Sequence, residues 1–257
     1  MPKKPLRCAI DRATPILLAA VLALQTVRVA WAEDMRDHGQ HGETAHGGQL
    51  YGQVLVEQLE LRWADGDEIA AWDAQAWYGG DYEKLRLKTE GTAARGHGVE
   101  EAEVQVLYSR LVDYFWDVQA GLRHDIRPRP SRSYGVLGLQ GLAPGFIEID
   151  LAAFVSERGD VSARLKAEYD ILVTQRLILQ PKAEINLAVQ EVPELGIGQG
   201  FNDLELGLRL RYELTREFAP YLGVQWHRKF GETATFARRE GDETDEVSLI
   251  AGIRFWF

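Results

Sequence analysis

Residues 161–189 alternate apolar and polar side chains over two long runs, and this pattern constrains the fold more than any other part of the sequence. In the first run, Val161–Val173, apolar residues occupy the odd positions, while polar and charged residues fill the even positions of Ser162–Asp170. After the turn Thr174-Gln175-Arg176, the alternation resumes over Leu177–Val189. A period of two over about a dozen residues indicates extended strands with one apolar and one charged face.

These two runs are unusually long for strands of a soluble protein, which average about 5–6 residues. At a rise of about 3.3 Å per residue and a tilt near 45°, a strand of about a dozen residues spans about 28 Å. That length is close to the thickness of the hydrocarbon core of a bilayer. The pair therefore predicts a hairpin that crosses a membrane.

The amino terminus has the three parts of a secretory signal peptide. A basic segment is followed by the apolar run 15–24 and by Ala30-Trp31-Ala32, which has small residues at the two positions that signal peptidase reads; the basic residues are Lys3, Lys4, Arg7 and Arg12. We expect cleavage after Ala32. The alternative is an uncleaved anchor helix, but the apolar run is too short to span a bilayer.

Cleavage would leave an acidic, cysteine-free chain. The full sequence has a net charge of −10, and residues 1–32 hold five basic residues, one acidic residue and the only cysteine, Cys8. The remaining chain has a net charge of about −14, which argues against nucleic acid as a partner, because nucleic-acid binding requires a basic surface. A chain can cross lipid only as apolar helices or as a closed barrel, because every backbone polar group must be paired. No apolar helical span follows residue 32, so a membrane-spanning form of this chain would be a barrel.

From Leu50 onward the chain divides into about twelve alternating runs separated by turn signals. We predict an all-β fold, a transmembrane antiparallel up-and-down β-barrel of about 12 strands. In the first run, Glu57 interrupts the apolar face and predicts a β-bulge or a later strand start. The chain ends on Phe257, at the end of an alternating strand, and this resembles the signal read by outer-membrane assembly machinery. Aromatic residues near run ends fit interfacial girdles.

The connections between runs alternate in length, as they do in outer-membrane barrels with short periplasmic turns and longer outer loops. Short turns are predicted near Gly80, Asp113, Pro144, Gln175 and Arg216, and longer loops near Gly96, Pro130, Gly198 and Glu240. The rival architecture is a soluble β-sandwich or a lipocalin-like periplasmic barrel, whose apolar face would form the core. Strand length, the terminal Phe and the aromatic positions favour the membrane barrel, whose charged face would line the lumen.

Residues 33–49 have no strand pattern, and we predict a short, disordered periplasmic tail between the signal peptide (1–32) and the barrel (50–257). This tail holds the densest set of metal ligands in the sequence: Met35, Asp37, His38, His41 and His46. Neutral imidazoles suit copper, nickel or zinc, and a thioether favours copper(I). The alternative is a solvated polar linker whose histidines are incidental.

Three segments resemble the copper resistance protein B family of outer-membrane proteins: 58–91, 134–188 and 196–226, which begin QLELRWADGDEI, YGVLGLQGLAPG and GIGQGFNDLELG. The resemblance implies a role in copper resistance and homeostasis, with copper bound in the periplasm and handled at the outer membrane without catalysis. It also implies membrane lipid, copper ions and a periplasmic multicopper oxidase or copper carrier as partners. Family members carry amino-terminal repeats rich in Met and His. Met35 is the only methionine after residue 32, whereas the tail has three histidines, so the tail favours copper(II).

Two other functions stay open from the sequence. The first is a metal-independent pore or purely structural barrel, in which His227 on the lumen face, and His97 and His124 in or near outer loops, would not be ligands. The second is a barrel phospholipase. That enzyme would need Ser, His and a polar orienting group together on a lipid-facing surface, whereas Ser109 and His227 have lumen parity and no nucleophile motif surrounds any Ser.

Overall fold

The structure is a computed structural model that describes residues 49–64, 67–96 and 98–257. These residues form strands, one α-helix and one 3₁₀-helix in the order β1 (Tyr51–Ala64), β2 (Asp67–Gly79), β3 (Glu83–Ala94), β4 (Gly98–Asp113), β5 (Trp116–Arg127), β6 (Arg132–Ala143), β7 (Ile147–Ser156), β8 (Val161–Glu168), β9 (Ile171–Leu172), β10 (Leu177–Ala188), η1 (Pro193–Leu195), β11 (Gly200–Tyr212), β12 (Phe218–Lys229), α2 (Gly231–Glu240) and β13 (Asp245–Trp256). Among the described residues, no helix is long and apolar enough to span a membrane.

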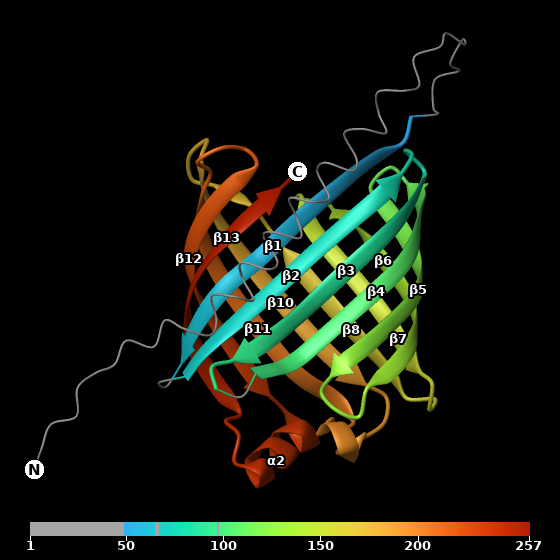
Figure 1. The fold of residues 1–257 in the computed structure, drawn as a ribbon, viewed down its shortest axis with the longest axis vertical. Helices are drawn as coiled ribbons and strands as arrows, with labels where there is room; N and C mark the ends of the chain where they lie inside the picture. Colours follow the sequence, from blue (N-terminus) through green and yellow to red (C-terminus); the bar gives the residue numbers. More distant parts are fainter. Residues whose placement is uncertain (1–48, 65–66, 97) are drawn as a thin grey trace, which may run out of the picture. The chain divides into compact units, whose positions relative to one another are not determined.

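The strands form one closed antiparallel barrel, as the alternation predicts (Figure 1). Strand β1 pairs with β13, and β10 pairs with β11, so the sheet has no open edge. Because β8 and β9 are two parts of the same strand, the barrel has twelve strands. The closure is completed at Phe257, whose backbone exchanges hydrogen bonds of 2.9 and 3.0 Å with Val54.

An even number of strands puts the start of β1 and the end of β13 at the same end of the barrel, which we call the terminal end. The opposite end, which carries η1 and α2, is the loop end. At the terminal end the connections near Gly80, Asp113, Pro144, Gln175 and Arg216 are short turns, as predicted. At the loop end, only 189–199 and 230–244 are long. The connections near Gly96 and Pro130 are short, because the flanking strands extend further than the sequence indicates.

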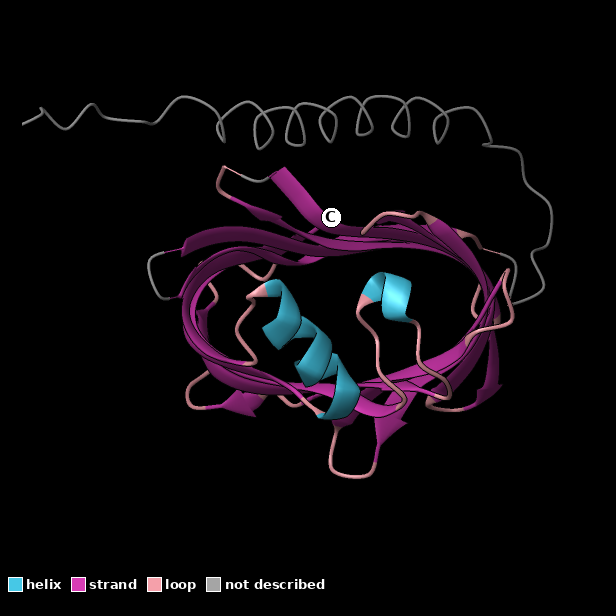
Figure 2. Ribbon diagram, turned by 90° about the horizontal axis from the view of Figure 1, so that it is seen from below, coloured by secondary structure: helices cyan, strands magenta, loops and turns pink. Residues whose placement is uncertain are grey.

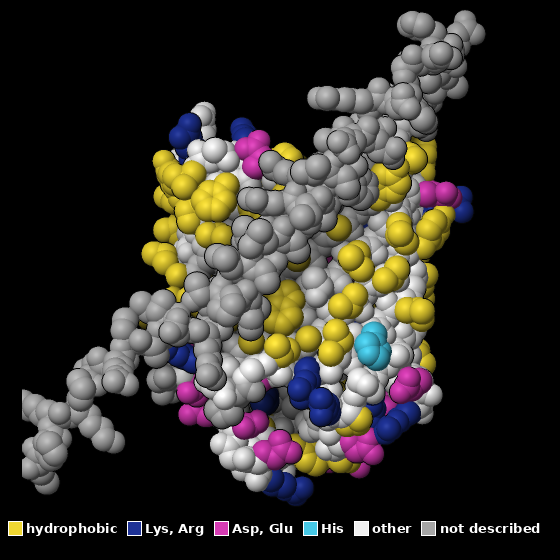
Figure 3. Space-filling model, in the orientation of Figure 1, with side chains coloured by type: hydrophobic (Ala, Val, Ile, Leu, Met, Phe, Trp, Pro, Cys, Tyr) yellow, Lys and Arg dark blue, Asp and Glu magenta, His cyan; other side chains and the backbone are white. Residues whose placement is uncertain are grey.

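The two faces of the wall have opposite chemistry. Large apolar side chains point away from the barrel and stay exposed on nearly every strand, as on Leu122, Leu222 and Leu249. Figure 3 shows apolar side chains spread over the visible wall and charged side chains concentrated toward the loop end. Buried polar residues lie on the inner face. Apolar groups exposed on this scale suit a lipid-facing wall, and polar groups paired inside suit a lumen.

Two irregularities of the strands follow directly from the sequence. The pairing of β1 with both neighbours shifts between Val56 and Gln58 or Leu59, so Glu57 forms the predicted bulge. The strand formed by β8 and β9 is interrupted at Tyr169 and Asp170. Tyr169 donates its backbone N–H to the carbonyl of Pro181 at 3.1 Å, but Pro181 has no N–H with which to complete the ladder in return.

The loop end is partly covered by its two long connections. Figure 2 looks along the barrel from this end and shows α2 and η1 lying across the opening. The Thr233 hydroxyl of α2 accepts a hydrogen bond of 2.8 Å from the backbone N–H of Gly198. Phe201 and Phe230 pack edge to face, with ring centroids 4.8 Å apart. The two connections therefore support each other.

Candidate functional site in the barrel lumen

The tail residues predicted to bind copper, Met35, Asp37, His38, His41 and His46, lie outside the described residues, as does the predicted signal peptide. Of the predicted tail, only Gln49 is described, and it is exposed beside the start of β1. Among the described residues, the lumen holds the charged side chains that could form a functional site. Its charged side chains fall into two clusters with different surroundings.

The first cluster, which we call the packed cluster, consists of Glu60, Arg62, Arg209, Tyr221 and Gln225. The Glu60 carboxylate accepts hydrogen bonds from Arg209 Nε and Nη2 at 3.2 and 3.1 Å, from Arg62 Nε at 2.7 Å and from the Tyr221 hydroxyl at 2.9 Å. The Glu60 and Arg209 side chains are 0% and 2% exposed. This carboxylate is thus fully desolvated and saturated with donors.

Glycines on the strands between Glu60 and Arg209 make room for the packed cluster. A Cβ on Gly252 of β13 would lie 2.6 Å from the Tyr221 ring and 2.8 Å from Glu60 Cβ. A Cβ on Gly223 of β12 would lie 2.6 Å from the carbonyl oxygen of Leu208 and 3.2 Å from Arg209 Cγ. Long side chains can therefore lie flat across these two strands, and they fill this part of the lumen.

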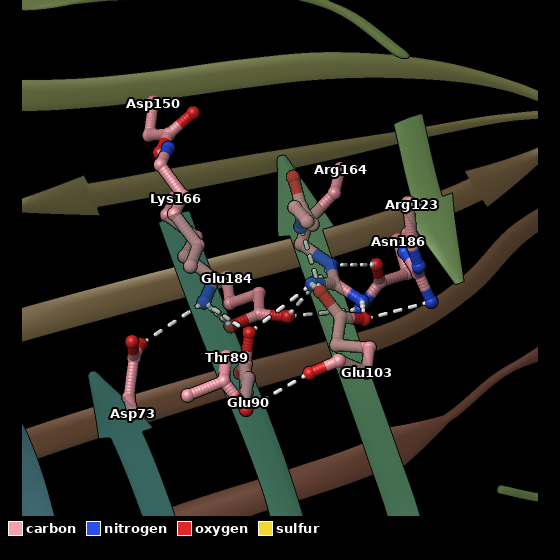
Figure 4. Close-up of polar contacts among 12 residues, drawn as sticks. Asp73, Thr89, Glu90, Glu103, Arg123, Asp150, Arg164, Lys166, Glu184 and Asn186 are labelled. Carbon is pink, nitrogen blue, oxygen red and sulfur yellow. Dashed lines mark hydrogen bonds and ion pairs between the residues drawn. The ribbon is translucent and has the colours of Figure 1, made fainter. Parts of the chain in front are cut away.

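The second cluster, which we call the bridging cluster, joins opposite walls of the barrel, and its members are Asp73, Glu90, Glu103, Arg123, Arg164, Lys166, Glu184 and Asn186 (Figure 4). Lys166 Nζ on β8 lies 2.7 Å from Glu90 on β3, 3.3 Å from Asp73 on β2 and 3.8 Å from Glu184 on β10. Strand β8 pairs with β7 and β10 only. The contacts with β2 and β3 consequently cross the lumen.

Arg164 lies two residues before Lys166 on β8, and its side chain crosses the lumen in the same direction. Its guanidinium lies 3.0 Å from Glu103, 3.1 Å from Glu90 and 3.5 Å from Glu184. It also lies over the ring of Phe154, 5.7 Å from the centroid. Phe154 belongs to a small apolar cluster inside the barrel with Leu107, Tyr134 and Val136, so the Arg164 guanidinium has an apolar support.

A cavity of about 410 Å³ extends from the terminal end to the bridging cluster. Its terminal part is formed by residues of the turns and strand ends near 114–117 and 141–149. Eight carboxylates and four basic side chains line it: Glu57, Asp73, Glu90, Glu103, Asp117, Glu148, Asp150 and Glu168, with Arg86, Lys88, Arg164 and Lys166. Glu148 lies directly opposite Glu168 in the β7–β8 ladder. This excess of negative charge favours cations over anions in the cavity.

The two barrel histidines that the structure describes, His124 and His227, do not form a metal centre, and His97 lies outside the described residues. His227 lies on the lumen-facing register of β12, as predicted, directly opposite Glu205. His124 is exposed on β5 and forms a hydrogen bond of 3.0 Å with the Ser133 hydroxyl. Within the described ranges, no three His, Cys, Asp or Glu side chains are grouped closely enough to hold a metal ion.

The residues considered for a phospholipase are not brought together. Ser109 is 1% exposed on β4, and His227 lies on β12, which is not a neighbour of β4 in the sheet. In the part of the chain that the structure describes, Ser109 Oγ has no hydrogen-bond partner. A nucleophile needs a base within hydrogen-bond reach, and these two residues do not provide that pair.

Ion pairs also hold the loop end. Arg132, with a 3% exposed side chain, lies 2.5 Å from Asp160 and 2.9 Å from Glu194 of η1, and Glu194 lies 2.5 Å from Arg158. Hydrogen bonds from Arg158 and Arg132, together with their positive charges, lower the pKa of Glu194 below its usual range. The connection 189–199 is thereby tied to the ends of β6 and β7.

Comparisons with known proteins agree with this architecture. Residues 50–257 match the model of the family described as Copper resistance protein B precursor (CopB). The chain is 43% identical over 216 residues to a copper resistance protein B from Escherichia coli, covering 84% of this chain and 73% of the relative. A copper resistance protein B homolog from Pseudomonas syringae pv. tomato is 40% identical over the same shares. The names of these relatives do not describe enzymes.

Among solved structures, the NanC porin superposes with a TM-score of 0.53 at 13% sequence identity, covering 80% of this chain and 99% of the porin. At this identity the likeness concerns the fold alone. It agrees with an outer-membrane barrel and carries no information about what passes through the lumen.

The bridging cluster is the part of the site that the sequence left undefined. The alternation predicts that Arg164, Lys166, Glu168, Lys182 and Glu184 line the lumen in a mixed-charge network, and the structure confirms their direction. The alternation does not identify partners across the lumen, because that requires the curvature of the closed barrel. Glu90 and Glu103 could be assigned only to the inner face.

Proposed function

The chain belongs to the copper resistance protein B family and is an outer-membrane barrel, and from this premise we propose that it binds copper ions in the periplasm and handles their passage at the outer membrane. Copper is the cargo in this proposal, and no reaction is catalysed. The observation that carries the proposal is the family match over residues 50–257, the whole of the barrel.

The geometry of the terminal end supports a periplasmic role for the tail. The tail is covalently joined to the barrel at Gln49, next to the start of β1. The cavity with its excess of carboxylates extends to this same end. With the terminal end facing the periplasm, as short turns indicate, a cation released by the tail would meet a lumen whose charge attracts it.

The tail provides Met35, Asp37, His38, His41 and His46 as ligands. Three imidazoles and a carboxylate suit copper(II), whereas copper(I) capture relies on thioethers and thiolates. With one Met in the tail, we propose that copper(II) is the bound form. A periplasmic multicopper oxidase or copper carrier of the same resistance system is the partner that would deliver or receive the ion.

Equilibrium copper titration tests the role of the tail. The protein of residues 33–257 is compared with a protein of residues 50–257 and with a variant of residues 33–257 in which His38, His41 and His46 are replaced by Asn. The Asn variant keeps the length of the tail and removes only its imidazoles. We expect both altered proteins to lose the tightest copper site. Equal affinity and stoichiometry in all three would disprove the role of the tail.

A second candidate is a metal-independent pore, which the cavity in the lumen favours. The same titration separates the two candidates, because a metal-independent pore has no copper site for the Asn variant to lose. Ser109→Ala addresses the phospholipase alternative, since any lipase activity that survives this substitution does not depend on Ser109 as nucleophile.

A further inference from the structure

The Lys166 ammonium lies in the lumen among carboxylates, as a small bound cation would. It is held by carboxylates from three strands, Glu90 at 2.7 Å, Asp73 at 3.3 Å and Glu184 at 3.8 Å. We propose that Lys166, assisted by Arg164, is a tethered cationic plug, and that the barrel is a cation-selective channel that this plug keeps closed. This proposal rests on the proposed function, because it explains how passage of cations through the lumen would be controlled.

The location of the plug follows from the two clusters. The packed cluster fills the part of the lumen between β1 and β11, and its central pair, Glu60 and Arg209, has almost no exposed surface. The cavity lies in the other part and ends at Glu90, Glu103, Arg164 and Lys166. We therefore infer that a path from the cavity to the loop end passes the contacts that Arg164 and Lys166 make across the lumen.

The charges around the plug determine which ions it excludes. The cavity carries twice as many carboxylates as basic groups. Rings of carboxylates select cations in channels. With Lys166 in position, its ammonium satisfies Asp73 and Glu90 and repels other cations at short range. Without it, Glu90 and Glu184 would keep Arg164 as a partner and Asp73 would keep only Lys182, 4.0 Å away, so the carboxylates that face the path would be less neutralised.

The plug borders open space, whereas the central pair of the packed cluster, Glu60 and Arg209, does not. The Lys166 side chain is 15% exposed and borders the cavity, while Arg209 in the packed cluster is 2% exposed. Lysine carries a compact charge on a flexible four-carbon stem. A cation that enters the cavity and takes over the Asp73 and Glu90 oxygens would release Lys166 without disturbing the strand hydrogen bonds.

Electrical recording in planar lipid bilayers tests the plug, with potassium chloride as the only salt and no copper. The wild-type protein, Lys166→Met and Lys84→Met are compared. Lys84 lies on the same inner register of β3 as Arg86 and Lys88, and its ammonium lies over the Trp77 ring. Its replacement therefore removes an equal charge from the lumen wall without removing a contact across the lumen.

We expect Lys166→Met to raise the mean conductance at least about fivefold over wild type and to shift the reversal potential in a salt gradient toward that of a cation-selective channel. Lys84→Met should behave like wild type. The proposal is overturned if wild type already conducts as well as Lys166→Met, if folded Lys166→Met stays closed, if its current is anion-selective, or if Lys84→Met opens the lumen equally.

Folding of each variant is checked by the different gel mobility of heated and unheated barrels. If Lys166→Met does not fold, the charge-balanced variant Lys166→Gln with Asp73→Asn replaces it, with the same expected opening and the same outcomes against it. Because the recording contains no copper, it can fail while copper binding by the tail succeeds, and the reverse also holds.

Discussion

The packed cluster and the bridging cluster use the same residue types on the same inner face, yet their surroundings differ. In the packed cluster the Glu60 carboxylate is 0% exposed and accepts donors from Arg62, Arg209 and Tyr221. In the bridging cluster Lys166 and Arg164 are 15% and 16% exposed, and they border a cavity. A buried charge that loses its partner cannot recover its solvation, whereas a charge beside a cavity can take up water. The difference separates a structural cluster from one that can rearrange.

The largest effect is expected from Glu60→Leu, which leaves Arg209 buried without its carboxylate partner. Breaking a buried ion pair in this way costs about 3–5 kcal/mol. We expect this loss in the free energy of unfolding, measured by urea titration of the protein in lipid vesicles with tryptophan fluorescence. A loss no larger than that of Lys166→Met would contradict the distinction between the two clusters.

Gly252→Ala tests the packing of the same cluster by a different route. The added Cβ would lie 2.6 Å from the Tyr221 ring and 2.8 Å from Glu60 Cβ, and such overpacking costs about 1–3 kcal/mol. Gly135→Ala in β6 is the matched control, because its nearest neighbour, the Val155 carbonyl oxygen, is 4.0 Å away. Equal unfolding free energies for the two variants would show that this part of the lumen is not tightly packed.

Lys166→Met should destabilise the barrel less, by about 1–2 kcal/mol, because only its charged hydrogen bonds are lost and the cavity can hydrate the carboxylates left behind. The same urea titration measures this loss. A loss of unfolding free energy as large as that of Glu60→Leu would mean that Lys166 stabilises the fold as much as the Glu60–Arg209 pair does. Lys166 would then have a structural role and would not act as a plug.

The smallest effect is expected at the loop end, where Glu194 is bound by Arg158 and Arg132. Because the pKa of Glu194 is lowered in the folded protein, this contact is present above the ordinary glutamate range of about 4.3 and is lost only as the pH falls further, through the lowered pKa. Hydrogen exchange of 189–199, corrected for intrinsic rates, should therefore increase only at acidic pH.

Glu194→Gln is the control for the loop-end experiment. It removes the titrating carboxylate, so exchange in 189–199 should be faster than in wild type at neutral pH and should change little on acidification. An acid-dependent increase in this variant as large as in wild type would assign the effect to another group.

The sequence predicts most of the fold, because alternation with a period of two determines which side chains face lipid. The bulge at Glu57, the terminal-end turns and the inner direction of Lys166 were all predictable. The break at Tyr169 was predictable in principle from Pro181, which cannot donate to the ladder. The helix α2 was not, because Gly231–Glu240 is mostly polar and buries only the small residues Ala234 and Ala237, which give no clear apolar helical pattern.

The candidate site was less predictable than the fold. Contacts such as Lys166–Glu90 join residues from strands that are not neighbours, so they depend on barrel closure rather than on local pattern. The cavity likewise depends on which side chains fill the lumen. Glycines such as Gly252 affect this, because they make room for the long side chains of the packed cluster. The copper ligands predicted in 33–49 lie outside the described residues and stay a prediction.

Copper flux into lipid vesicles tests the central claim most directly. Vesicles that contain a copper-sensitive dye and the protein of residues 33–257 are compared with vesicles that contain residues 50–257 and with empty vesicles. We predict copper entry well above the rate of empty vesicles, and slower entry at low copper concentration when the tail is missing. Entry no faster than in empty vesicles at any copper concentration would contradict the proposal that this barrel handles copper passage.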